Sequence, residues 1–265
     1  MNRNSLDNIT PVVLTYNEEP NIARTLASLR WAQKVVVLDS GSTDSTETIA
    51  RAYPNVVWYT RGFDSFLSQW NHALTLLDGG TEYVLGLDAD METTGPLLDE
   101  ISRVFLSQSF AGGMIPFDYR YYGRSLAGSL CASQLRLFRR EQVTVTQLNH
   151  GHKFSVPGQI YHFNSRLVHD DRKPIDRWLK SQLQYQLQNE QELANGGGRL
   201  RDRLRNAGVM PPLMGLLAYI KAGGPFKGAA AARYAYERMT TESILALRLM
   251  DNRLKESSDS AETDA

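Results

Sequence analysis

Two aspartates separated by a single residue are the side chains in this sequence whose types and spacing most clearly suggest chemistry. Asp88 and Asp90 lie in the stretch 83–92, YVLGLDADME, where the apolar residues before Asp88 are typical of a buried strand. Polar residues that follow such a strand lie at the sheet edge where α/β proteins bind ligands. The two carboxylates leave one face of an extended segment and repel each other unless a hard cation binds there. We therefore predict that they hold Mg²⁺ or Mn²⁺, which commonly complete their shell with substrate phosphates.

The same pattern has two other interpretations. An Asp-x-Asp sequence also occurs in turns and helix caps, where the carboxylates accept backbone hydrogen bonds. It supplies the nucleophile and the acid in a class of phosphatases as well, but that motif has Thr or Val two residues after the second aspartate. This sequence has Glu92 there, which disfavours the phosphatase.

The residues around these aspartates alternate between strand and helix patterns. We expect strands at 9–16, 34–39 and 56–59 and one ending at Asp88, with helices at 20–31, 44–52 and 67–77 between them. Asp44 and Glu47 are spaced as a capping box at the start of the second helix. Such alternation predicts an α/β fold with a parallel sheet and right-handed crossovers. Its polar residues gather at the carboxyl ends of the strands, where such sheets bind ligands.

Three motifs in this half of the chain resemble those of family 2 glycosyltransferases with the GT-A fold. They are TYNE at 15–18, DSGSTD at 39–44 and DAD at 88–90, and their order and spacing agree with that family. The sequence QLRLF at 134–138 is similar to a strand of lipopolysaccharide-core and other cell-envelope glycosyltransferases. The resemblance extends to about Arg139. It implies a Rossmann-like, mostly parallel sheet flanked by helices, with a helical C-terminal extension.

The resemblance implies that the first motif lines a nucleotide pocket. The residues that it implicates are Thr15, Tyr16, Asn17 and Glu18. It also implies that Asp39 accepts a hydrogen bond from the base, usually uracil, as a carboxylate can from a ring N–H. Asp39 could instead be a turn residue, and Asn17 and Glu18 could cap the first helix. The expected donor is a nucleotide-sugar, with a UDP-sugar favoured.

The resemblance further implies that Asp88-Ala89-Asp90 carries the metal that bridges the donor diphosphate. The charge of the metal would offset the charge that develops on the departing nucleoside diphosphate. A family segment beside the donor corresponds to 63–74, where Gln69, Asn71 and His72 are candidates. Polar residues on a partly exposed helix are more often simply solvated, and we expect His72 to be structural.

An inverting transferase also needs a carboxylate or an imidazole to deprotonate the acceptor hydroxyl. In many relatives this base lies in a Val-His-Glu-like string after the QLRLF-type strand, but the corresponding stretch 149–153, NHGHK, has no carboxylate. The next carboxylates are Asp170 and Asp171, before a helix expected from 175, and either is a candidate base. They could also only cap that helix. The neighbouring histidines could complete the metal shell or act as base; they are His150, His152, His162 and His169.

The domain organisation follows from these patterns. We predict a catalytic domain over 1–174, with a nucleotide-sugar half at about 1–92 and an acceptor half at about 93–174. A helical region should follow at 175–255 and a disordered acidic tail at 256–265. Arginines at 199–205 precede an apolar segment at 209–220, which is too short to span a bilayer. The region 199–255 is expected either to lie peripherally in a membrane interface or to pack on the catalytic domain or pair subunits into a homo-oligomer.

Composition narrows the partners. The 265 residues contain 29 basic and 29 acidic side chains, so no net charge favours nucleic acid, and we expect none as a partner. The single cysteine, Cys131, excludes an internal disulfide and fits a reducing compartment. The first residues lack an apolar signal-peptide core. The expected location is the cytoplasm, with peripheral contact at the inner face of the cytoplasmic membrane if 199–255 lies in the interface.

Together these observations predict an inverting, metal-dependent glycosyltransferase that moves a sugar from a nucleotide-sugar to an envelope glycan or lipid-linked acceptor. One alternative is a sugar nucleotidyltransferase, which would have a glycine-rich loop after the first strand where TYNEEP stands at 15–20. The other is a non-catalytic sugar- or membrane-binding relative. Its only support is the missing carboxylate in 149–153.

Overall fold

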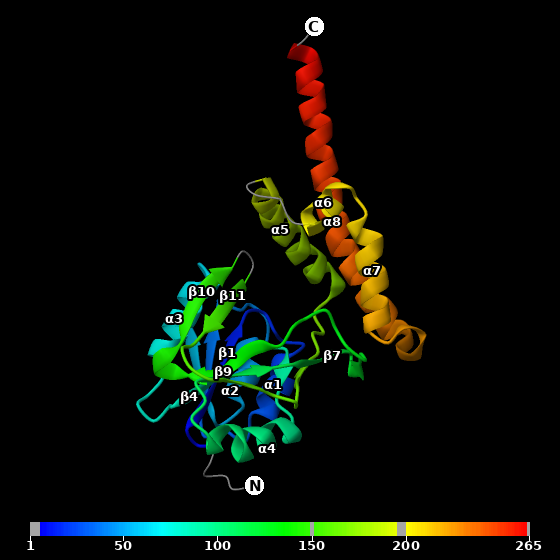
Figure 1. Ribbon diagram of the computed structural model, residues 1–265. Coiled ribbons are helices and arrows are strands. Elements are labelled where there is room, and N and C mark those ends of the chain that lie inside the picture. The colour runs from blue at the N-terminus through cyan, green and yellow to red at the C-terminus, as the bar shows by residue number, and fades with distance from the viewer. Residues whose placement is uncertain (1–5, 149–150, 195–199, 264–265) are drawn as a thin grey trace. The chain divides into compact units, whose positions relative to one another are not determined.

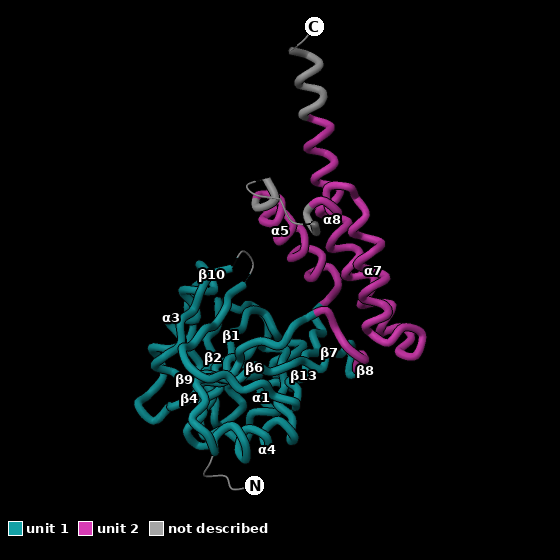
Figure 2. Tube along the Cα trace, in the orientation of Figure 1, with its two compact units in different colours: residues 1–124, 131–173 teal, residues 125–130, 174–265 magenta. Residues whose placement is uncertain are grey.

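The computed structural model describes residues 6–148, 151–194 and 200–263 (Figure 1). The chain forms two compact units (Figure 2). Unit 1 comprises 1–124 and 131–173, and unit 2 comprises 125–130 and 174–265. No sequence pattern indicated that 125–130 would belong with the second unit. His150 and the glycine-rich break expected at 195–198 lie outside the described residues.

Within the described residues, a seven-stranded sheet forms the centre of unit 1 (Figure 1). In sheet order its strands are β12 (Ile160–His162), β6 (Gly112–Ile115), β9 (Gln134–Arg139), β4 (Tyr83–Asp88), β1 (Ile9–Thr15), β2 (Val35–Asp39) and β3 (Val56–Thr60). β4, β1, β2 and β3 are parallel, and β9 runs antiparallel to both of its neighbours. The predicted α/β class with a mostly parallel sheet is confirmed.

Both faces of this sheet are buried, which explains why its strands appear in the sequence as continuous apolar runs. Val13 and Leu85 belong to the core that the first and fourth helices cover. Val12 and Val84, one residue before them, point to the opposite face and share a core with Trp70 of the third helix. The helices of unit 1 are α1 (Ile22–Ser28), α2 (Thr46–Arg51), α3 (Phe66–Thr75) and α4 (Gly95–Arg103).

The start of α2 differs from the predicted capping box. The helix begins at Thr46, and its N-cap, Ser45, makes no side-chain capping bond. The carboxylate of Asp44 instead accepts a hydrogen bond from Thr46 N at 3.0 Å and another from Glu19 N at 3.2 Å. Glu47 pairs with Arg51 on the helix surface. Asp44 therefore ties the turn after β2 to the loop after β1.

Two smaller sheets complete unit 1. A hairpin is formed by β10 (Thr144–Leu148) and β11 (Gly151–Ser155). The other is a four-stranded sheet. In sheet order its strands are β5 (Met91–Glu92), β13 (Leu167–His169), β7 (Phe117–Tyr121) and β8 (Arg124–Ser125). Because β5 follows Asp90 directly and β13 ends directly before Asp170, this sheet joins the two acidic motifs.

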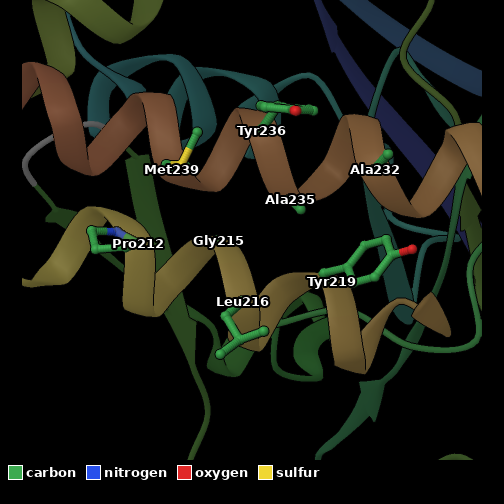
Figure 3. Close-up of a pocket in the computed structure, with 8 residues that line it drawn as sticks. All are labelled: Pro212, Gly215, Leu216, Tyr219, Ala232, Ala235, Tyr236 and Met239. Atoms are coloured by element: carbon green, nitrogen blue, oxygen red, sulfur yellow. The ribbon is translucent and has the colours of Figure 1, made fainter. Parts of the chain in front are cut away.

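Unit 2 is helical in its described part. Its elements are α5 (Ile175–Ala194), α6 (Leu200–Asn206), α7 (Met210–Lys221), the 3-10 helix η4 (Gly224–Lys227) and α8 (Gly228–Thr263). α7 lies along α8, and Gly215 allows their close approach, because a Cβ at this position would lie 3.2 Å from Met239 Cβ. A groove of about 460 Å³ between the two helices is lined mostly by apolar and small residues (Figure 3).

Two further observations concern this unit. None of the helices in the described ranges is both long enough and apolar enough to cross a membrane. Where we predicted a disordered tail over 256–265, α8 continues to Thr263, and 264–265 lie outside the described residues. The sequence from 229 to 263 contains neither glycine nor proline, so no residue of either type interrupts the helix.

Candidate active site at the strand termini

The carboxyl ends of three neighbouring strands bring the predicted motifs together. β1 lies between β2 and β4, and the register pairs Thr15 with Asp39 and Leu14 with Asp88. The predicted nucleotide-binding and metal-binding segments therefore lie at the same edge of the sheet. Of the first motif, Tyr16 is exposed, whereas Thr15 is buried, and its hydroxyl finds no hydrogen-bond partner among the described residues.

Asn17 and Asp39 shape the loops at this edge. Asn17 adopts a positive φ of 54°. Its N–H donates to Ser42 Oγ at 2.7 Å, and its Oδ1 accepts from Thr43 N at 2.7 Å. Asp39 is buried, and its Oδ2 accepts from Gly41 N at 2.8 Å and Ser42 N at 2.7 Å. The carboxylate for which the resemblance implied base recognition thus also organises the turn that follows β2.

Gln69 is fully buried beside the same turn. Its Nε2 donates to Ser40 Oγ at 2.9 Å and to the Arg61 carbonyl at 3.0 Å, and its Oε1 accepts from Arg61 Nη1 at 2.7 Å. The amide therefore fixes the position of Ser40, the neighbour of Asp39. Gln69 is therefore a buried residue that holds the turn next to the predicted nucleotide-binding edge.

Asp88 is paired with an arginine that the sequence analysis did not single out. Arg136 of β9 is buried, and its Nη2 donates to Asp88 Oδ2 at 3.0 Å. Burial raises the pKa of Asp88, but the charges of Arg136, His152 and His169 and the hydrogen bond from Arg136 together hold it below its usual range. A charged residue within the apolar alternation of 134–138 was the signal that could have identified Arg136.

Asp90 is almost completely buried and lies between two basic side chains. Its Oδ2 is 3.7 Å from Lys173 Nζ, and its Oδ1 is 3.7 Å from His169 Nε2. Oδ1 is buried without a hydrogen-bond partner in the part of the chain that is described. The intervening Ala89 points into the core, and its carbonyl accepts from Thr25 Oγ1 at 2.7 Å.

These two aspartates fit part of the shell of a hard divalent cation. Such ions take oxygen ligands, and Mg²⁺ is often held by one or two carboxylates while phosphates and water supply the rest. The orphaned Oδ1 of Asp90 and the partly exposed carboxylate of Asp88 are available oxygens. Within the described ranges, no three His, Cys, Asp or Glu side chains form a group suited to a metal. A metal here would draw the remaining ligands from substrate or water.

Lys173, which the sequence analysis also missed, connects the first motif to the candidate base. Its ammonium lies 2.7 Å from Glu18 Oε1 and 3.2 Å from Asp171 Oδ2. Burial raises the pKa of Glu18 to about 7, and Asp90 raises it too, while Lys173 and Asn21 oppose the shift. Residues that follow β1, β4 and β13 therefore form one charged cluster.

The neighbouring candidates Asp170 and Asp171 lie in different environments. The Asp170 side chain is only 2% exposed, and its Oδ2 accepts from Gly123 N at 2.9 Å and Arg172 Nη2 at 2.7 Å, with Arg24 Nη1 at 3.3 Å. The Asp171 side chain is 30% exposed. Asp170 is therefore a structural anchor, and Asp171 is the carboxylate of the pair that solvent or substrate can reach.

Asp171 is also held in its ionised form. Its Oδ1 accepts from Asn21 Nδ2 at 2.9 Å and from Lys173 N at 3.0 Å. Burial raises the pKa of Asp171, but the charge of Lys173 and these hydrogen bonds outweigh burial and keep the pKa below its ordinary value. A carboxylate that stays ionised and partly accessible can accept a proton.

The remaining histidines divide by position. His169 lies beside Asp90 and stacks on Tyr119 with ring centroids 4.4 Å apart. His152 packs against Trp70, and burial lowers its pKa to about 4. His162 ends β12 at the outer edge of the large sheet. Of these three, His169 is the one whose imidazole lies within 4 Å of a carboxylate of the Asp-x-Asp motif.

The mostly parallel sheet, with its acidic motif at the end of β4, defines the GT-A class of glycosyltransferase fold. The chain superposes on the mannosyltransferase PcManGT from Pyrobaculum calidifontis, solved with GDP-Man and Mn²⁺, with a TM-score of 0.50 and 19% identity, covering 95% of this chain and 87% of that one. Residues 11–125 match the model of glycosyl transferase family 2. The resemblance to family 2 is confirmed over this segment.

Curated relatives agree with this assignment. An uncharacterized glycosyltransferase of Rickettsia conorii is 32% identical over 110 residues, which are 41% of this chain and 38% of that protein. One from Rickettsia bellii is 33% identical over 102 residues, which are 38% of this chain and 34% of that protein. The chain therefore matches little more than a third of the length of these relatives.

Proposed function

We propose that this protein is an inverting, metal-dependent glycosyltransferase that uses a nucleotide-sugar donor. One observation carries the proposal: the pairing of β1 with β2 and β4 brings Asp39 and Asp88 to one sheet edge, on either side of the first motif. Ligands of open α/β sheets bind outside the carboxyl ends of the strands. The family match over 11–125 supports glycosyl transfer as the chemistry.

Each part of the site has a role in this proposal. The edge formed by Thr15, Tyr16, Asn17, Glu18 and Asp39 binds the nucleotide, and Gln69 supports it. Asp88 and Asp90 hold Mg²⁺ or Mn²⁺, and His169, whose Nε2 lies 3.7 Å from Asp90 Oδ1, is the histidine proposed to complete the protein's share of the ligands. The metal would supply positive charge to the donor diphosphate. The structure solved with GDP-Man and Mn²⁺ concerns a different protein, so both UDP- and GDP-sugars belong in the tests.

Asp171 is the proposed base. It lies on the same edge as the metal-binding aspartates, and Lys173 contacts both Asp171 and Asp90. A base removes the acceptor proton while the hydroxyl attacks the anomeric carbon, and the bond to the diphosphate oxygen breaks. Direct displacement of this kind inverts the anomeric configuration, which NMR of the product measures. Retention of configuration would contradict the single-displacement part of the proposal.

The central test concerns Asp90. We expect Asp90→Asn to weaken Mn²⁺-dependent donor binding by about a hundredfold or more, because even loss of outer-sphere support commonly costs about 10–100-fold in metal affinity. Isothermal titration with UDP-GlcNAc and GDP-Man, with and without Mn²⁺, gives this number. Asp99→Asn, at a partly exposed position of α4, is the matched control and should bind as the wild type does. Unchanged metal-dependent binding by Asp90→Asn would remove the proposed metal site.

The acceptor is proposed to be an envelope glycan or a lipid-linked sugar that the protein meets at a membrane surface. The support is in unit 2, where Leu216 and Ile220 of α7 and Phe226 of η4 are exposed, the last of these by 95%. Lys221 and Lys227 are exposed beside them. Apolar side chains flanked by basic ones suit the interface of an anionic bilayer.

A vesicle-sedimentation assay tests this contact. Binding to vesicles with anionic lipid should exceed binding to neutral vesicles, because each lysine contributes about 1 kcal/mol near an anionic surface. Phe226→Asp together with Ile220→Asp should abolish it. Leu254→Asp is the control, because it changes an exposed leucine of α8 that lies outside α7 and η4. Equal sedimentation with and without anionic lipid, in all variants, would contradict the membrane contact.

A further inference from the structure

Three carboxylates from separate segments of unit 1 converge on the ammonium group of Lys173. Its Nζ lies 2.7 Å from Glu18 Oε1, 3.2 Å from Asp171 Oδ2 and 3.7 Å from Asp90 Oδ2. The Lys173 side chain is largely buried. One positive charge of the chain therefore stands among three carboxylates in a poorly solvated space, where charges interact strongly.

This lysine keeps its charge. Two carboxylate oxygens lie within 3.2 Å of its Nζ, and opposite charges at this distance favour the charged form of a lysine. The hydrogen bond that Nζ donates to Glu18 adds to the same effect. The ammonium is thus a permanent feature of the cluster at neutral pH.

Asp90 is shared between this ammonium and the proposed metal site. Its Oδ2 faces Lys173, while its buried Oδ1 has no hydrogen-bond partner among the residues described and lies 3.7 Å from His169 Nε2. A metal ion held through Asp90 would therefore share one carboxylate with a cation of the chain. Two cations on one carboxylate repel each other.

We infer that Lys173 is the resident cation of this acidic cluster and that it weakens the binding of free divalent metal to the donor-free protein. The inference rests on the proposed function, because it takes Asp90 as a metal ligand. A nucleoside diphosphate brings negative charge that compensates for the ammonium. Metal and diphosphate should therefore bind with positive coupling, so that each raises the affinity for the other.

Titration of Mn²⁺ alone tests this inference without any enzymatic reaction. Isothermal titration, checked by the electron paramagnetic resonance of free Mn²⁺, should show that Lys173→Gln binds Mn²⁺ about tenfold or more tightly than the wild type. Lys173→Arg, which keeps the charge, should bind as the wild type does. Lys34→Gln, which removes a lysine paired with Asp78 at the surface, is the matched control and should change nothing.

The direction of the change separates this role from a merely structural one. If Lys173 only held the cluster in shape, its replacement would weaken Mn²⁺ binding. Equal or weaker binding by Lys173→Gln, or no Mn²⁺ binding by either protein, would overturn the inference. With saturating UDP or GDP present, the advantage of Lys173→Gln over the wild type should shrink, and an undiminished advantage would overturn the coupling.

Lys173→Gln alone leaves the carboxylates of the cluster without their cation, and the protein could then fail to fold. A second comparison avoids this problem. Glu18→Gln combined with Lys173→Gln removes one charge of each sign, and this double variant is compared with Glu18→Gln alone. The double variant should bind Mn²⁺ more tightly by a similar factor. If the wild type transfers sugar but neither comparison shows tighter Mn²⁺ binding, the proposed function stands and the inference about Lys173 fails. If removal of Lys173 tightens Mn²⁺ binding but the wild type turns over no donor, the inference stands and the proposed function fails.

Discussion

Two adjacent aspartates show how strongly the surroundings of a residue decide its use. Asp170 accepts from a main-chain N–H and two arginines and is almost inaccessible, whereas Asp171 is partly exposed. The identical side chains are indistinguishable in sequence, which is why both were candidate bases. Only the folded positions of Gly123, Arg24 and Arg172 separate them.

The two aspartates should therefore respond differently to substitution. Asp171→Asn should lower kcat about a hundredfold or more while donor binding is kept, because the amide cannot accept the proton. Asp170→Ala should instead lower the free energy of unfolding by roughly 1–3 kcal/mol, because it removes the buried carboxylate that accepts hydrogen bonds from Gly123, Arg24 and Arg172. Steady-state kinetics and urea unfolding of both variants measure the two effects. Full turnover by Asp171→Asn would exclude it as the base.

The sequence analysis did not identify the cations of the site, and it could not have identified the carboxylates with which they pair. Arg136 lies 48 residues along the chain from Asp88, and Lys173 reaches both its neighbour Asp171 and the distant Asp90. The positions of Asp39 and Asp88 could be predicted, because each ends a continuous apolar strand. The partners could not, because side-chain pairing across a sheet depends on register, and no local pattern specifies that β9 lies beside β4.

At the scale of elements, the sequence predicted strands and helices correctly where the spacing of apolar residues determines the element. The strands of the parallel sheet and α3 appear close to their expected places, because apolar residues mark their faces. The predicted capping box at the start of α2 was wrong. Asp44 accepts hydrogen bonds from the N–H groups of Thr46 and Glu19, and Ser45 is the N-cap. That choice depends on a loop from a neighbouring strand.

The hairpin of β10 and β11 packs on α3 through His152, and this contact should depend on pH. Burial disfavours the imidazolium and lowers the pKa of His152 to about 4, while Asp88 partly opposes the shift and Arg136 adds to it. In the unfolded chain the pKa returns to 6.5. The folded state therefore has this stability above about pH 6.5 and loses it as the pH falls toward 4.

Urea unfolding at two pH values measures the contribution. Between about pH 7.5 and pH 5, the wild type should lose about 2 kcal/mol more unfolding free energy than His152→Phe, whose ring can remain packed on Trp70. His72→Phe, on the more exposed side of α3, is the control and should follow the wild type. An identical pH dependence in wild type and His152→Phe would show that the imidazole is solvated.

At the scale of the whole molecule, the binding of donor should stabilise the fold. A ligand that binds only the folded state adds about 2.7 kcal/mol to the free energy of unfolding at 100 times its Kd. In a thermal-shift screen of UDP, GDP and their sugars with Mn²⁺, one of the two nucleotides should therefore raise the Tm more than the other does. The same screen on Asp90→Asn should show a smaller rise. No shift with any nucleotide at millimolar concentration would contradict the proposed donor class.

The pairing of β5 with β13 has one more consequence. His169 faces Met91 in this pairing, and the N–H of Asp170 donates to the carbonyl of Asp90 at 3.1 Å. The backbone of the DAD motif is thereby fastened to the segment that carries Asp171, and main-chain bonds of this kind tolerate almost any side chain. Evolution could thus exchange the surrounding surface for new acceptors while the separation of the proposed base from the proposed metal site stayed constant.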